Sequence, residues 1–194
     1  MNFDFERESK KNLVMKVIIK VFIWVAQIIA VIFLAYFIIN YTLEKTDMLG
    51  LSMEDTLTND DPIIINKLTY HITDPKRFDI IVFKEAGREH SYYDIKRIYG
   101  LPGESLRIKD NNIYINGKII EDIVNVDPMV NYGLAEEEIH LEENEYFVLG
   151  DNRNSSEDSR FASVGNVTRD EIIGKAFIRL SPFNFIHKLN LKSN

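Results

Sequence analysis

The hydrophobic pattern of the chain changes once, just before residue 42. Residues 21–39 are almost continuously apolar, with Gln27 as the one strongly polar interruption. At about 1.5 Å per residue, a helix of this length nearly matches a hydrocarbon core of roughly 30 Å. A cleaved secretory signal usually has a shorter apolar core, and no A-x-A-like site follows this one. A buried core helix that is apolar all round would be unusual in a domain of this size. We therefore predict a retained transmembrane anchor over residues 21–41.

The flanking charges predict how this anchor is oriented. Basic residues favour the cytoplasmic side of a membrane, and here they precede the span, whereas only Lys45 follows it closely. We therefore expect a single-pass protein of the cell membrane, with residues 1–20 in the cytoplasm and residues 42–194 as an extracytoplasmic domain. The basic residues of the N-terminal segment are Arg7, Lys10, Lys11, Lys16 and Lys20.

Past the anchor, the pattern consists of short apolar or alternating runs separated by turn signals. Such runs, rich in β-branched and aromatic residues, predict β-strands. Asn116-Gly117 between two of them indicates a hairpin, because both central residues of its turn need positive φ. We predict a mostly β fold, in which a transmembrane helix precedes an antiparallel β-sheet or partial barrel with a small inserted cap around residues 111–145. The predicted strands are 62–65, 78–83, 92–99, 112–115, 118–120, 146–149 and 172–180.

Composition then excludes several kinds of chemistry. The chain has no cysteine, which removes thiolate catalysis, cysteine-ligated zinc and disulfides. The net charge of the chain is −7, and because residues 1–20 carry +2, the remainder carries −9, which argues against nucleic-acid binding. The histidines fit no recognisable metal or nucleophile spacing and the G-x-S-x-G marker is absent, although a Ser-His-Asp triad can still assemble in space. We expect no metal and no other cofactor. The histidines are His71, His90, His140 and His187.

The polar segment 150–160, GDNRNSSEDSR, directly follows a predicted strand. It fails as a calcium-binding loop, because Arg153, Ser156 and Ala162 occupy positions that need oxygen ligands or glycine. Two interpretations remain, a simple polar turn or a hydrogen-bonded network that fixes other side chains.

Lys96 is a candidate general base. Strand alternation places Lys96 and Arg97 on opposite faces, so one of the two should point toward an apolar side. If it is Lys96, burial disfavours the charged form, and a neutral lysine is a competent base. Taken alone, a solvent-facing lysine is the commoner case. The presence of Ser52 favours the catalytic interpretation of Lys96, since a serine nucleophile needs a base and a Ser-Lys pair supplies one without histidine.

In these residues the chain resembles the bacterial type I signal peptidases, the membrane-anchored Ser-Lys proteases that cut signal peptides from exported proteins. Its single anchor is similar to that of the Gram-positive type, and the order and spacing of the motifs extend the resemblance over nearly the whole chain. The motifs are residues 50–57 (GLSMEDTL), 77–83 (RFDIIVF), 96–104 (KRIYGLPGE), 150–160 and 173–176 (IGKA), with Arg179, Pro182 and Phe183.

The resemblance implies the catalytic roles. Ser52 would attack the scissile carbonyl, and Lys96 would take the serine proton and deliver it to the leaving amine. Ser156 would hydrogen-bond to the Lys96 amine and orient it. The oxyanion would be held largely by the backbone N–H of Ser52, because Gly50 offers no side-chain donor where some relatives have a hydroxyl.

The resemblance also implies the supporting and binding residues. An ion pair between Asp158 and Arg160 would brace the loop, with Gly150, Asp151 and Arg153 as its further members. A shallow pocket at Met53, Ile80 and Val82 would admit only small side chains, which gives an A-x-A-like preference. The expected partners are signal-peptide-bearing pre-proteins and the lipid bilayer, with no nucleic acid.

Some positions depart from the family pattern and leave other functions open. Asp55 stands where the family usually has proline, and Tyr99, Glu104 and Ala162 are milder departures. Asp55 leaves room for a non-catalytic or dedicated assembly factor for exported proteins such as pilins. A self-cleaving Ser-Lys protease of the stress-repressor kind is disfavoured by the anchor, and an anchored structural β-domain leaves the motifs unexplained.

Overall fold

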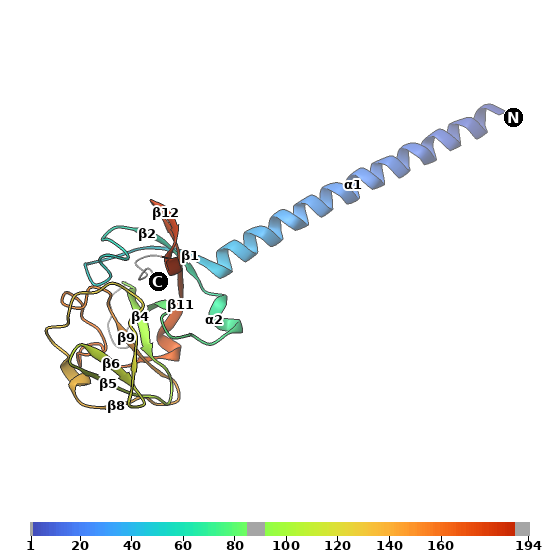
Figure 1. The fold of residues 1–194 in the computed structure, drawn as a ribbon. Helices are drawn as coiled ribbons and strands as arrows, with labels where there is room; N and C mark the ends of the chain where they lie inside the picture. Colours follow the sequence, from blue (N-terminus) through green and yellow to red (C-terminus); the bar gives the residue numbers. More distant parts are fainter. Residues whose placement is uncertain (1, 85–91, 189–194) are drawn as a thin grey trace. The chain divides into compact units, whose positions relative to one another are not determined.

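The structure, a computed structural model, describes residues 2–84 and 92–188 (Figure 1). It divides into two compact units, which meet in sequence between Thr42 and Leu43. The first unit is a single helix, α1 (Asn2–Thr42). Its part from Leu13 to Thr42 is long and apolar enough to cross a membrane, and it contains the whole of the predicted span 21–41. The large side chains along this part are exposed and apolar on every side, as lipid requires.

The second unit consists of two antiparallel sheets. The larger sheet has the strand order β1-β2-β11-β3-β4-β9-β10, with β12 paired to β11, and the smaller has the order β7-β6-β5-β8. Figure 1 shows β5, β6 and β8 gathered together at one end of this unit. The strands are β1 (Leu43–Asp47), β2 (Pro62–Asn66), β3 (Ile80–Phe83), β4 (Asp94–Gly100), β5 (Ser105–Lys109), β6 (Asn112–Ile115), β7 (Lys118–Ile120), β8 (Ile139–His140), β9 (Glu145–Leu149), β10 (Val167–Thr168), β11 (Ile172–Leu180) and β12 (Phe183–Phe185).

Among its described residues, the second unit also contains four short helices. They are α2 (Thr69–Ile72) and the 3-10 turns η1 (Gly133–Glu136), η2 (Arg169–Glu171) and η3 (Ile186–Lys188). The mostly β fold class with an N-terminal apolar helix is therefore confirmed.

Every predicted strand is present, with its ends moved by at most a few residues. The hairpin at Asn116-Gly117 is confirmed as well, since φ is 50° and 75° at these two residues and β6 pairs with β7 across them. The prediction missed β1, β5, β8, β10 and β12. Of these, β1 is polar (LEKTD) and becomes a strand by pairing with the apolar β2, which no local pattern shows. Because β5 joins the small sheet, that sheet begins at Ser105, before the expected cap 111–145.

Strand β4 lies at the centre of the fold. It pairs with β3 on one side and β9 on the other, and every residue after Asp94 is buried. Its side chains enter three separate apolar clusters, through Ile95, Ile98 and Tyr99. Both faces of β4 are thus covered, which corrects the expectation that only one of Lys96 and Arg97 would be buried.

Candidate active site

Ser52 lies in the loop between β1 and β2, and buried side chains on both sides fix this loop. Met48, Met53 and Leu57 all belong to the apolar cluster that also contains Ile95 of β4. The backbone after Ser52 forms a tight turn, in which the Met53 carbonyl accepts hydrogen bonds from the N–H groups of Thr56 and Leu57. Ser52 itself is half-buried, so its hydroxyl is held at the edge of this cluster and within reach of solvent.

Strand β4 brings Lys96 to this serine. The Lys96 Nζ atom lies 3.1 Å from Ser52 Oγ, although the two residues are far apart in sequence. Only 3% of Lys96 is exposed. The side chain of Asp94, two positions earlier on the same face of β4, also contacts the amine, with Oδ1 3.5 Å from Nζ. A serine hydroxyl within hydrogen-bonding distance of a buried amine is the arrangement that a Ser-base pair needs.

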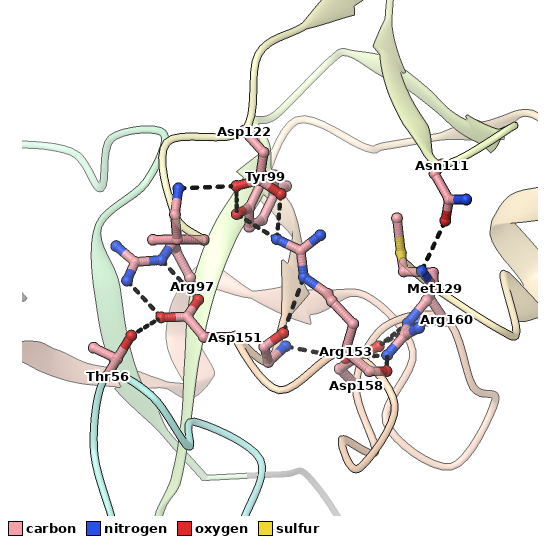
Figure 2. A network of polar contacts seen from close by, with 12 residues as sticks. Thr56, Arg97, Tyr99, Asn111, Asp122, Met129, Asp151, Arg153, Asp158 and Arg160 are labelled. Atoms are coloured by element: carbon pink, nitrogen blue, oxygen red, sulfur yellow. Dashed lines mark hydrogen bonds and ion pairs between the residues drawn. The ribbon is translucent and has the colours of Figure 1, made fainter. Parts of the chain in front are cut away.

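Loop 150–160 is closed by its own charged residues. Asp158 accepts hydrogen bonds from Arg160 at 2.8 and 2.9 Å and from the Gly150 N–H at 3.0 Å. The Arg160 guanidinium also donates to the Arg153 carbonyl at 2.6 Å. Figure 2 shows this pair beside Arg153. Asp158 and Arg160 therefore form an ion pair across the loop and tie its far end back to Gly150.

Gly150 places that loop against the nucleophile. A Cβ at this position would lie 2.4 Å from the carbonyl oxygen of Ser52 and 2.2 Å from Ser156 Oγ, so only glycine fits. The Ser52 carbonyl also accepts a hydrogen bond from the Asn152 N–H at 3.0 Å. The loop and the serine backbone are therefore in direct contact.

Ser156 is beside the dyad but does not contact it as expected. Its hydroxyl is buried and has no hydrogen-bond partner among the residues that the structure describes. The expected hydrogen bond from Ser156 to Lys96 is thus absent from this geometry, because the hydroxyl packs against Gly150.

A second ion pair joins the same loop to β4. Asp151 receives two hydrogen bonds from Arg97, at 2.8 and 2.6 Å, and one from the Thr56 hydroxyl at 2.5 Å (Figure 2). Burial alone lowers the pKa of Arg97, but the hydrogen bond and charge of Asp151 outweigh it, so the pKa is raised above its ordinary value. Through this pair, the turn after Ser52, strand β4 and loop 150–160 are held as one piece.

A third polar group links β4 and the segment after β7 to the loop. Arg153 donates to Tyr99 Oη at 2.6 Å, to Asp122 at 2.5 Å and to the Gly150 carbonyl at 3.1 Å. Tyr99 in turn donates to Asp122 at 2.6 Å. Burial raises the pKa of Tyr99 well above its ordinary value. The positive charge of Arg153 lowers this pKa, and the negative charge of Asp122 raises it, so the net shift is upward. Sequence reasoning missed Asp122, which lies in no motif. It gave no role to Thr56, Arg97 or Tyr99, although the motifs include them.

The three residues expected to bind substrate lie in the core. Met53, Ile80 and Val82 belong to one apolar cluster and are at most 3% exposed. They therefore do not line an open pocket in this structure, because they pack against one another beneath the Ser52 loop. The exposed apolar side chains nearest to Ser52 in sequence are those of Leu49 and Leu51.

The three histidines that the structure describes lie outside this site. His71, His140 and His187 are exposed, and His90 lies outside the described residues. The Nδ1 atom of His140 is 2.7 Å from Ser105 Oγ, so a Ser-His pair does exist, across β5 and β8 on the surface of the small sheet. Within residues 2–84 and 92–188, no cluster of three His, Asp or Glu side chains is arranged to hold a metal.

Comparison with known proteins gives a consistent result. Residues 21–181 match the family described as signal peptidase, peptidase S26. The chain is 37% identical to a probable signal peptidase I-2 of Synechocystis over 79% of this chain and 70% of that protein. It is 33% identical to signal peptidase I of Bacillus amyloliquefaciens over 97% of this chain and 99% of that protein. A crystal structure of a signal peptidase I from Enterococcus faecalis matches 53% of this chain and 97% of its own, with 33% identity and a TM-score of 0.44.

Proposed function

This chain belongs to the S26 family of signal peptidases, and we propose that Ser52 is its nucleophile and Lys96 its general base. The chain is a serine peptidase that removes signal peptides, and the non-catalytic assembly factor is not favoured by these relatives. The observation that carries the dyad assignment is the 3.1 Å distance between Lys96 Nζ and Ser52 Oγ.

The reaction proceeds by acyl transfer through Ser52. Its Oγ attacks the carbonyl carbon of the scissile bond while the Lys96 amine, as general base, takes the hydroxyl proton. The tetrahedral intermediate collapses, the C–N bond breaks, and the Lys96 ammonium gives its proton to the leaving amine. Lys96 then takes a proton from water, whose oxygen attacks the ester carbonyl. The bond from that carbon to Ser52 Oγ breaks, Lys96 returns the proton to Oγ, and the signal peptide is released. The backbone N–H of Ser52 stabilises the oxyanion, and removal of one such donor typically costs a factor of about 10²–10³.

The charged loop positions this chemistry. Asp158 and Arg160 close the loop, and Gly150 brings it to the Ser52 carbonyl. Asp151 fixes the turn after the nucleophile through Thr56 and fixes β4 through Arg97. In this scheme Ser156 is a buried hydroxyl beside Gly150, without a hydrogen-bond partner among the described residues.

The substrates are pre-proteins whose signal peptides lie at the membrane. The protein is membrane-anchored, and the charges around α1 support a cytoplasmic N-terminus with the β unit outside. Anchoring enzyme and substrate in the same bilayer raises their effective concentration. We further propose that the residues before the cleavage site have small side chains, because Met53, Ile80 and Val82 are packed in the core next to Ser52 and offer no open space for a large one.

Cleavage of a labelled pre-protein with an A-x-A site tests the dyad. The full chain in detergent should cut after the last alanine, and both Ser52→Ala and Lys96→Ala should lose cleavage while keeping the wild-type unfolding midpoint. Ser105→Ala is the matched control, because Ser105 Oγ also lies within hydrogen-bonding distance of a candidate base, His140. Loss of cleavage in Ser105→Ala with retention in Ser52→Ala would move the nucleophile to the Ser105–His140 pair.

A further inference from the structure

The Lys96 amine has one contact that the proposed dyad does not use. Its Nζ lies 3.5 Å from Oδ1 of Asp94, which is the one ion-pair partner of Lys96 among the residues that the structure describes. The two residues are separated by one position on β4, so strand alternation places both side chains on the same face. Both groups belong to one rigid strand, and their relative position is therefore fixed by the backbone rather than by a loop.

The burial of the two side chains differs sharply. Lys96 is 4% exposed at its side chain, whereas Asp94 is 37% exposed. Asp94 is the first residue of β4, opposite Phe83 at the end of β3, and Lys96 is opposite the buried Ile81. The carboxylate therefore lies on the solvent side of the amine, and Ser52 Oγ is the other group that the amine contacts.

The chemistry of a base explains what a carboxylate can do at this place. A general base that takes the proton of a nucleophile becomes positively charged, and a third group often orients it and stabilises that charge. The Ser156 hydroxyl, the group expected for this task, has no hydrogen-bond partner among the described residues. Asp94 contacts the amine directly and carries the opposite charge.

We propose that Asp94 is the positioning residue of the general base, which holds the Lys96 amine toward Ser52 and stabilises the positive charge that it gains during catalysis. This inference rests on the proposed Ser52–Lys96 dyad. Because the charge develops on Nζ only as the proton moves, the interaction strengthens in the transition state and acts on kcat rather than on KM.

Steady-state cleavage of the A-x-A pre-protein by the full chain in detergent tests this inference. Asp94→Ala should lower kcat by about 10–100-fold, as expected when a catalytic group loses its alignment, and leave KM within about twofold. Asp94→Asn keeps a hydrogen-bond acceptor but not the charge, so its kcat should lie between those of wild type and Asp94→Ala. Asp127→Ala removes an exposed carboxylate on the connection between β7 and β8 and should behave as wild type.

Two further measurements separate the possible failures. Equal unfolding midpoints of wild type and Asp94→Ala exclude a structural cause for a fall in kcat. Lys96→Ala is assayed beside them: if it retains cleavage, the dyad itself is wrong. If Lys96→Ala is inactive and Asp94→Ala has the wild-type kcat, the dyad stands and the role of Asp94 is overturned. A raised KM with unchanged kcat would also overturn it, since Asp94 would then contact the substrate instead of the base.

Discussion

The carbonyl oxygen of Ser52 lies so close to Gly150 that a Cβ at residue 150 would stand 2.4 Å from it. The same Cβ would meet Ser156 Oγ at 2.2 Å, so a side chain at this position must displace either the nucleophile loop or the loop that follows β9. The Gly150 N–H is meanwhile held by Asp158 at 3.0 Å, which prevents the glycine from moving away. The absence of a side chain at residue 150 is therefore a condition for the position of Ser52.

Gly150→Ala should consequently inactivate the peptidase without unfolding it. A displacement of the Ser52 backbone by about 1 Å can cost about 10²-fold in kcat, because the hydroxyl then leaves its alignment with Lys96. Steady-state cleavage of an A-x-A pre-protein measures this effect. Gly117→Asn, in the β6–β7 turn where a Cβ meets nothing within 4 Å and asparagine tolerates positive φ, is the control. Wild-type kcat in Gly150→Ala would show that the two loops separate freely.

The buried pair of Asp151 and Arg97 predicts a large loss of stability when one partner is removed. Their side chains are 0% and 2% exposed, so Asp151→Asn leaves a buried guanidinium without its counter-charge. Breaking such a pair typically costs about 3–5 kcal/mol. The midpoint of urea unfolding should fall accordingly. Replacement of both charges, as in Asp151→Leu with Arg97→Met, should cost less than Asp151→Asn alone, and a larger cost would argue that packing rather than charge limits the site.

Local signals in the sequence were sufficient for much of the fold. The Asn116-Gly117 turn and the apolar runs of β2 and β9 predict their elements because each signal lies within a few residues. Strand β1 could not be predicted, since its polar residues become a strand only through pairing with β2. The burial of both Lys96 and Arg97 was equally hidden, because the layers that cover the two faces of β4 come from distant segments.

In the candidate site too, some residues could be predicted from local motifs and others only from the fold. Ser52, Lys96 and loop 150–160 were identified because motifs mark them, and the structure brings them together. Asp122 carries no such mark, and its contact with Arg153 joins the segment after β7 to the loop across 31 residues of sequence. Asp94 and Lys96 are only two residues apart in sequence. Strand alternation predicts that they share a face of β4, but it does not predict that Lys96 is buried while Asp94 is partly exposed.

Tyr99 predicts a dependence of stability on alkaline pH. Burial raises its pKa in the folded state well above the ordinary value of 10.0, so above about pH 10 the unfolded chain loses this proton while the folded chain keeps it. The contribution of Tyr99 to the free energy of unfolding is therefore complete below pH 10 and is lost as the pH rises further. Tyr99→Phe should be less stable than wild type by about 1–3 kcal/mol at pH 7, because Arg153 and Asp122 lose a buried hydrogen-bond partner.

The difference in the free energy of unfolding between wild type and Tyr99→Phe should then become smaller above pH 10, since phenylalanine has no proton to lose. Urea unfolding of both proteins between pH 7 and pH 11 measures it. The other tyrosines with raised pKa, Tyr70, Tyr93 and Tyr146, are common to both proteins and cancel in the difference. A constant difference over this range would show that Tyr99 ionises equally in the folded and unfolded chains.

Asp55 stands in the turn that carries Ser52 and adopts a backbone conformation closed to proline. Its φ is 77°, whereas the proline ring fixes φ near −65°. Asp55→Pro should therefore rearrange the turn, although proline is the usual residue here in the family that the motifs resemble. Thr56 follows at once and bonds to Asp151, so the rearrangement reaches the buried ion pair as well as Ser52.

Asp55→Pro should accordingly lose more than about 1 kcal/mol of stability, as expected for a proline at an incompatible φ, together with most of its cleavage activity. Asp55→Asn is the matched control, because asparagine adopts positive φ at least as readily as aspartate and should retain both properties. Urea unfolding and cleavage of an A-x-A pre-protein measure the two effects on the same samples. If Asp55→Pro matched the wild type in both, the turn would have a second conformation of nearly equal free energy, and the left-handed residue at 55 would not be what positions Ser52.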